Sequence, residues 1–131
     1  MGLGIFHLAN SPNGDILDSM DTKTLARFEA RAQVFKALAH PSRLLIVDEL
    51  TRGARCVCDL TALVGSDMST VSKHLSQLKT AGVVRDERRG SQIWYSLRMT
   101  CVDRFCACVD GELEQQICEQ WDLVCAGPRS R

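Results

Sequence analysis

The chain has 131 residues, and its 16 acidic and 16 basic side chains give a formal net charge of zero. This length fits one domain with a proper core, by the usual prior of about 100 to 200 residues per domain. The balanced charge excludes the strong basic bias that often marks nucleic-acid binders, so any DNA-binding surface must come from local clustering. Because we find no apolar run long enough to span a bilayer and no signal-peptide pattern, we expect a soluble, cytoplasmic protein without membrane contact.

Composition divides the chain into three parts. Residues 1–20 are rich in Gly, Asn, Ser and Asp, which predicts a flexible N-terminal arm. Residues 21–125 carry helical and alternating apolar patterns and are predicted to form a single domain. Residues 126–131 are predicted to be a flexible C-terminal tail.

Helical patterns open the predicted domain. Apolar residues from Thr22 to His40 recur at helical spacing, which fits one or two helices. Pro41 suits the first turn of the next helix, and Gly53 suits its C-terminal end. We expect that next helix to be central to the core.

The segment after Cys58 predicts a helix, a tight turn and a second helix. Asp59 can cap a short helix over 60–64, and Gly65 and Ser66 suit the turn. An apolar stripe indicates the second helix and consists of Val71, Leu75 and Leu78, before Gly82 closes it. A helix-turn-helix of this kind is the shape that docks in a DNA major groove.

The face of the second helix opposite that stripe carries short hydrogen-bonding groups and a cation. Such groups suit phosphates and base edges. We therefore predict DNA contacts from Ser69, Thr70, Ser72, Lys73, Ser76 and Gln77. His74 lies on the flank of the stripe, where packing at the core edge is a simpler interpretation than a base contact or metal ligation.

A β-hairpin is predicted directly after the second helix. Apolar and polar residues alternate over 93–97, and a polar turn containing Gly90 precedes them. A hairpin in this position is a wing. Arg88 and Arg89 near its tip are predicted to meet phosphate or the minor groove, the simpler alternative being solvated turn residues.

A long amphipathic helix is predicted at the end of the domain. Thr100 can cap it, with Asp103 three residues on. Its apolar residues are spaced by three or four and are Val102, Phe105, Val109, Leu113, Ile117, Trp121 and Val124. So long an apolar face usually needs another subunit, so we expect a symmetric homodimer that also supplies a second DNA half-site. The expected fold is mainly α with a β-hairpin wing, a homodimeric winged helix-turn-helix.

The chain contains seven cysteines, at positions 56, 58, 101, 106, 108, 118 and 125. In a reducing cytosol these should be thiols, available for metal or redox chemistry. Cys56 and Cys58 are predicted to lie in an extended lead-in, or in a first helical turn that a bound ion could unwind. They point to the same side only where the chain is extended. Cys118 and Cys125 are most simply interpreted as small buried hydrophobes.

Several motifs carry a family resemblance over roughly positions 30 to 115. They are Phe35 to Arg43, Cys56 to Leu60, Val71 to Leu75 with Leu78, Ala81 to Val84, and the hairpin from Gly90 to Leu97. With these motifs the chain resembles the ArsR/SmtB family of winged-helix metal-sensing repressors. The resemblance implies a homodimer that binds double-stranded operator DNA with inverted-repeat symmetry and dissociates from it when an ion or other inducer binds.

The resemblance also narrows the choice of inducer. The C-terminal-helix zinc site of some members uses paired Asp/His and His/Glu ligands, whereas the only histidines of this chain are His7, His40 and His74, so we expect that zinc site to be absent. Cadmium and lead sensors with the Cys-Val-Cys motif use further thiol ligands from an N-terminal arm. Residues 1–55 of this chain contain no Cys, so a four-thiolate site of that layout cannot form. Arsenic-responsive members carry Cys-Val-Cys-Asp-Leu and often a third Cys where this chain has Thr61. The resemblance is therefore closest to the arsenic-responsive members.

Arsenite and antimonite are soft, thiophilic centres that are best satisfied by three thiolates. The predicted site consists of Cys56 and Cys58 with Cys101 as third ligand, or with Cys106 or Cys108 in its place, from the same or the partner subunit. Two thiolates with Thr61 or solvent remain a further possibility. No permanent cofactor is expected.

Two other interpretations of the thiols stay open. One is a cadmium- or lead-responsive repressor, and the other is a redox sensor in which a cysteine pair oxidises. We find no P-loop, dinucleotide fingerprint or nucleophile elbow, which predicts that the protein is not an enzyme.

Overall fold

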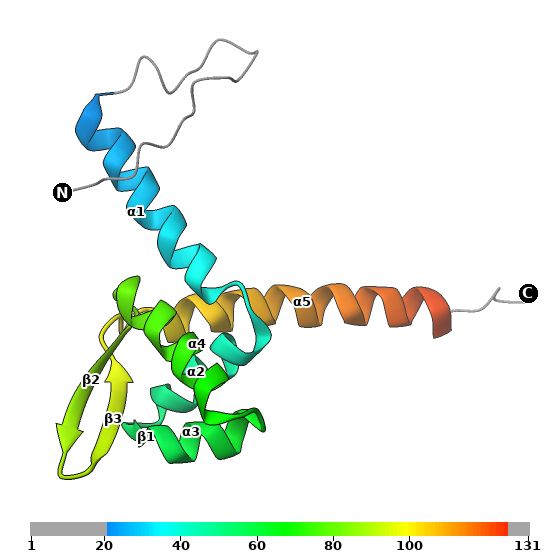
Figure 1. Ribbon diagram of the computed structural model, residues 1–131. Helices are drawn as coiled ribbons and strands as arrows, with labels where there is room; N and C mark the ends of the chain where they lie inside the picture. The colour runs from blue at the N-terminus through cyan, green and yellow to red at the C-terminus, as the bar shows by residue number, and fades with distance from the viewer. Residues whose placement is uncertain (1–20, 126–131) are drawn as a thin grey trace, which may run out of the picture.

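The computed structural model describes residues 21–125, so the predicted N-terminal arm (1–20) and C-terminal tail (126–131) lie outside the described residues. The elements in chain order are α1 (Thr22–Leu38), α2 (Pro41–Thr51), β1 (Arg55–Cys56), α3 (Val57–Val64), α4 (Met68–Thr80), β2 (Val84–Arg89), β3 (Gln92–Leu97) and α5 (Val102–Cys125). In Figure 1, α2, α3, α4 and the sheet gather together, while α1 and α5 extend beyond them in different directions. The predicted fold class, mainly α with a hairpin wing, is confirmed.

The first predicted helical region is one helix, α1, rather than two. The Asp21 carboxylate caps it by accepting a hydrogen bond of 2.8 Å from the Thr24 N–H. Pro41 stands in the first turn of α2, as predicted, and His40 is its N-cap. α2 ends at Thr51, and Gly53 follows with φ of +132°, a conformation that side chains with a Cβ rarely adopt.

The core lies where α2, α3, α4 and the sheet meet. The predicted stripe of α4 is fully buried, with 0 % exposure at Val71, Leu75 and Leu78. α2 contributes Ile46, Val47 and Leu50, which confirms its central place. The burial of these two helical faces holds the helix-turn-helix against the rest of the domain.

The wing belongs to a three-stranded antiparallel sheet with the strand order β1-β3-β2. The predicted hairpin is formed by β2 and β3, and Gly90 in its turn has φ of +63°. The two-residue strand β1 was not predicted, because two residues are too short for an alternating pattern. It pairs Arg55 with Tyr95 and Cys56 with Trp94, so it joins the wing to the start of α3.

α5 begins one residue later than predicted. Its first residue is Val102, and the Cys101 carbonyl accepts a hydrogen bond of 3.2 Å from the Phe105 N–H, so Cys101 rather than Thr100 precedes the helix. The reason is the chain path after β3: the Val102 N–H bonds to the Met99 carbonyl at 3.4 Å, in a turn that delays the helix.

Most of the apolar stripe of α5 is exposed in the described chain. The exposed fractions are 44 % for Phe105, 41 % for Val109, 49 % for Leu113, 51 % for Ile117 and 63 % for Trp121. The predicted stripe member Val124 has a side chain outside the described part.

Within the described ranges, no helix combines the length and apolar character that a membrane crossing needs.

Candidate nucleic-acid interface and thiol site

The N-terminus of α4 is organised by the carboxylate of Asp67. It accepts hydrogen bonds from the Thr70 N–H at 3.0 Å, the Thr70 hydroxyl at 2.6 Å and the Ser69 hydroxyl at 2.8 Å. The Thr70 and Ser69 hydroxyl bonds, with the Thr70 N–H, lower the pKa of Asp67 far below its usual value. Both hydroxyls therefore donate to Asp67, which leaves their lone pairs as acceptors for base amino groups.

The other predicted DNA contacts on α4 lie along its exposed face. Ser72, Lys73, Ser76 and Gln77 are all exposed. The Gln77 amide oxygen accepts a hydrogen bond from the Arg43 guanidinium, which leaves its NH₂ group available to donate to a partner. Sequence reasoning did not assign Arg43 a site role, because this contact joins residues 34 positions apart.

His74 packs beside these residues at the core edge, as interpreted from the sequence. It is half-buried, and its ring centroid lies 4.5 Å from that of His40. Burial lowers the pKa of His74, and the neighbouring His40 and Arg43 act in the same direction. These surroundings favour the neutral imidazole ring.

The two predicted wing arginines have different surroundings. Arg89 pairs with Glu87 at 3.2 Å, and its guanidinium lies over the Trp94 ring, 4.8 Å from the centroid. Arg88 is bonded through Nε to the Gly90 carbonyl at 3.3 Å. Because they are neighbours in one strand, they point to opposite faces of the sheet.

An ion pair between α4 and the wing links the two predicted DNA-contacting elements. The Lys79 Nζ lies 2.9 Å from the Asp86 Oδ2, and this contact raises the pKa of Lys79 and lowers that of Asp86. The pairing neutralises Asp86, the carboxylate of β2 nearest to α4.

Arg85 is a candidate phosphate contact that the sequence analysis missed, because that prediction considered only the arginines near the turn. It is exposed and lies two positions from Glu87 on the same strand, so the two side chains are on the same face of the sheet.

Cys56 lies where the wing sheet meets the helix-turn-helix. It is the last residue of β1 and also the N-cap of α3, and its sulfur accepts a hydrogen bond of 3.4 Å from the Asp59 N–H. The prediction that Asp59 caps a helix starting at Leu60 was therefore wrong. The helical backbone starts directly after Cys56, which has extended φ and ψ of −75° and 160°, and Asp59 falls in the first turn.

The two thiols of the motif differ in access. Cys56 is 5 % exposed, whereas Cys58 is exposed in the first turn of α3. The Asp59 N–H bond favours the Cys56 thiolate, but burial and the Asp59 carboxylate outweigh it, so the pKa of Cys56 lies above its usual value. At neutral pH the pair therefore includes a protonated, buried thiol next to an accessible one.

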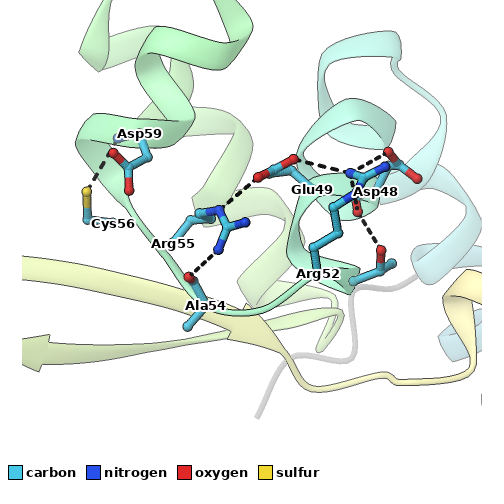
Figure 2. Close-up of polar contacts among 8 residues, drawn as sticks. Asp48, Glu49, Arg52, Ala54, Arg55, Cys56 and Asp59 are labelled. Carbon is cyan, nitrogen blue, oxygen red and sulfur yellow. Dashed lines mark hydrogen bonds and ion pairs between the residues drawn. The ribbon is translucent and has the colours of Figure 1, made fainter.

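A network of ion pairs holds β1 in place next to this thiol. Figure 2 shows Arg55 reaching from β1 to Glu49 of α2, while Arg52 pairs with both Glu49 and Asp48. The Arg55 Nε lies 2.8 Å from the Glu49 Oε1, and both side chains are partly buried. The position of Cys56 is therefore tied to the central helix on one side and to the wing on the other.

The remaining described cysteines do not join this pair within one chain. Cys101, Cys108 and Cys118 are exposed, and Cys106 is half-buried against the core. Cys118 thus departs from the interpretation as a buried hydrophobe, because the face of α5 around it has no neighbour among the described residues. The Cys125 side chain lies outside the described part. Across the described residues, no three Cys, His, Asp or Glu side chains converge to hold a metal ion.

Comparison with known proteins identifies the family. A family profile described as "Bacterial regulatory protein, arsR family" matches residues 40–86. The chain is 39 % identical over 82 residues to the arsenical resistance operon repressor of Bacillus subtilis, covering 62 % of this chain and 75 % of that protein. The chain belongs to the ArsR family.

Other transcriptional regulators are also similar to the chain. A transcriptional repressor SmtB homolog of Synechocystis sp. is 38 % identical over 77 residues, which cover 59 % of this chain and 58 % of that protein. The match thus spans little more than half the length of this relative. The fold is similar to the solution structure of a homodimeric winged helix-turn-helix DNA-binding domain from Mycobacterium bovis, a possible ArsR-family regulator. The TM-score is 0.68, at 30 % identity over 76 % of this chain and 92 % of that one.

Proposed function

We propose that this ArsR-family protein is a cytoplasmic transcriptional repressor and not an enzyme. It binds operator DNA of inverted-repeat symmetry as a homodimer and is released when arsenite or antimonite binds the thiolates of Cys56 and Cys58. The observation that carries the proposal is the double position of Cys56, which ends the strand paired to the wing and caps the first helix of the helix-turn-helix.

The DNA-binding half of the proposal rests on two elements held in fixed relation. α4 presents exposed Ser72, Lys73 and Ser76, and the wing presents basic side chains on both of its faces. The ion pair of Lys79 and Asp86 joins them at 2.9 Å. A helix for the major groove and a basic hairpin for the flanking phosphates together make a bipartite contact to one half-site.

The dimer is supported by the apolar surface that one chain leaves open. α1 exposes Phe28 and Phe35, and α5 exposes the stripe that starts at Phe105. A groove of about 610 Å³ runs between α1, α2 and α5, with Leu44 and Leu45 in its wall. Apolar patches of this extent mark interaction surfaces, and a second copy would also supply the second half-site. The Mycobacterium bovis domain of similar fold is described as homodimeric.

Release follows from the geometry of the thiol pair. Side chains two positions apart point to the same side only along an extended chain, and the extended backbone stops at Cys56, directly before the first helical turn. Cys56 and Cys58 would therefore share one ion if that first turn of α3 became extended. Opening this turn would also move the Asp59 N–H away from the Cys56 sulfur that accepts its hydrogen bond. The ion therefore favours a conformer with an altered start of α3, and a differential affinity of about 1–3 kcal/mol would weaken DNA binding roughly 5- to 150-fold.

The third ligand is proposed to come from the start of α5. Cys101, Cys106 and Cys108 are the candidates, and the partner subunit is the favoured source because none of them meets Cys56 within the described chain. Alternatively, Thr61 completes the site; its hydroxyl now donates to the Val57 carbonyl at 2.7 Å and would be freed if the first turn opened.

The test is fluorescence anisotropy of reduced protein on labelled DNA from upstream of its own gene, titrated in parallel with arsenite, cadmium and zinc. We expect release by arsenite at low stoichiometry in the wild type and no release in Cys56→Ser or Cys58→Ser. Cys118→Ser is the matched control, because it removes an exposed thiol of α5 and should keep the wild-type response. Tight binding that no ion weakens, but that peroxide does, would replace the proposal with redox sensing.

Proton release separates arsenite from the cadmium or lead alternative. Neutral arsenous acid reacts with three thiols to give three thiolate bonds and three waters, with no net proton released. A divalent cation expels one proton for each protonated thiol that it binds. Its affinity therefore rises about tenfold per pH unit for each proton expelled. Because the pKa of Cys56 is raised, cadmium binding should strengthen from pH 6 to pH 8 while arsenite binding stays nearly constant.

A further inference from the structure

We propose that Arg43 is the positioning residue that fixes the recognition helix α4 to α1, and that it thereby sets the separation of the two recognition helices in the dimer. The inference rests on the proposed function as a dimeric DNA-binding protein. It goes beyond that function by assigning the half-site spacing of the operator to one side chain, which contacts neither the thiol pair nor any residue of the wing.

The first set of Arg43 contacts is to the end of α1. Its Nε donates to the Ala37 carbonyl at 2.5 Å, and its Nη2 donates to the Lys36 carbonyl at 3.4 Å. These carbonyls belong to the last turn of a helix that ends at Leu38, where carbonyl groups lack an intrahelical donor. The guanidinium therefore serves as the C-terminal cap of α1 and complements its dipole.

The second set of contacts is to α4. Nη1 donates to the Gln77 Oε1 and lies 3.5 Å from the His74 Nδ1. Because arginine has only donors, the amide oxygen of Gln77 must face it. One planar group thus bridges the end of α1 and two residues of α4 that are 31 and 34 positions from it along the chain.

The bridge lies between the surface proposed for dimerisation and the surface proposed for DNA. α1 packs on α5 through Phe35 and Phe105, whose ring centroids are 5.4 Å apart, and both residues are close to half exposed. The same C-terminal end of α1 is capped by Arg43, which holds Gln77 of the recognition helix. In a dimer, this connection sets how far each α4 lies from the twofold axis.

The fold itself does not depend on this bridge. α4 is held to the core by Val71, Leu75 and Leu78, which are fully buried. Loss of the guanidinium therefore leaves the helix in place but removes the polar contacts that fix its distance from α1. Lysine cannot replace it, because a single ammonium on a flexible stem lacks the planar fork that reaches both helices.

The experiment measures tolerance of half-site spacing. Wild type, Arg43→Met, Arg43→Lys and the control Arg52→Met are titrated by anisotropy on the inverted repeat located by footprinting. They are also titrated on copies with one or two base pairs inserted between the half-sites. Each inserted pair rotates the half-sites by about 34–36° relative to each other. Arg52 is the matched control because it is an exposed arginine at the end of the same helix.

We expect the wild type and Arg52→Met to lose at least about tenfold in affinity on insertion. Both Arg43 variants should lose less than about threefold, from a lower starting affinity, while circular dichroism reports a folded protein. The inference is overturned if folded Arg43 variants discriminate spacing as the wild type does, or if Arg52→Met relaxes as they do. Failure of the wild type to bind any DNA would instead overturn the proposed function, and this inference with it.

Discussion

Replacing Cys56 separates its role as a helix cap from its proposed role as an ion ligand. The sulfur accepts one hydrogen bond, from the Asp59 N–H at 3.4 Å, in a position that is 5 % exposed. Serine is among the preferred N-cap residues, and its hydroxyl accepts the same bond more strongly than sulfur does. Cys56→Ser should therefore keep the start of α3 and the DNA affinity while abolishing the response to arsenite.

Cys56→Ala measures how much the capping hydrogen bond of Cys56 contributes to stability. Losing an N-cap acceptor costs about 0.5–2 kcal/mol in general, and the weak acceptor strength of sulfur places this case at the lower end. For a domain of this size, the expected fall in Tm is roughly 2–4 °C, whereas Cys56→Ser should melt at or above the wild-type temperature. Thermal unfolding followed by circular dichroism at one fixed protein concentration measures both values, since a dimer's Tm depends on concentration. Equal destabilisation by serine and alanine would refute the capping argument, and a Cys56→Ser protein still released by arsenite would refute the ligand assignment.

Three further changes test other parts of the structure. Leu75→Ala removes a fully buried side chain of α4 and should lower the free energy of unfolding by about 2–5 kcal/mol, seen as a lower urea midpoint at unchanged slope. Burial beside His40 and Arg43 makes the pKa of His74 lower in the folded protein than in the unfolded chain. The stability that His74 contributes is therefore complete above its unfolded pKa and is lost as the pH falls through its folded pKa. Tm should therefore drop on acidification from pH 7.5 to 5, and less steeply in His74→Gln; identical pH profiles would show that His74 is not the group responsible. Arg88→Ala should weaken DNA binding and reduce the slope of log affinity against log salt concentration by about one counterion. The slope should not change if Arg88 is only a solvated turn residue.

The parts of the fold that could be predicted were those encoded by local periodicity. The stripe Val71, Leu75 and Leu78 repeats at helical spacing, and all three side chains are fully buried. The hairpin around Gly90 was predictable because alternation and a turn signal lie within a short segment. In each case the physical cause of the structure lies within about ten residues, so a pattern in the chain carries it.

The parts that could not be predicted depend on contacts between distant segments. β1 exists only because Arg55 and Cys56 pair with the wing, about 40 positions later in the chain, and a two-residue strand has no periodicity of its own. That pairing also moves the start of α3 forward, so the cap passes from Asp59 to Cys56, a residue type that capping preferences do not favour. The bridge from Arg43 to Gln77 was hidden for the same reason, since neither residue carries a local signal of the other.

In the proposed mechanism, one ion at Cys56 and Cys58 and one operator compete through the start of α3. Linkage requires that an ion which weakens DNA binding is itself bound more weakly by the DNA complex, by the same factor. We would measure arsenite affinity by calorimetry for the free protein and for the protein saturated with operator. We expect arsenite to bind the complex more weakly, by the same factor of roughly 5 to 150 by which arsenite lowers the DNA affinity. Equal affinities in the two states would contradict it.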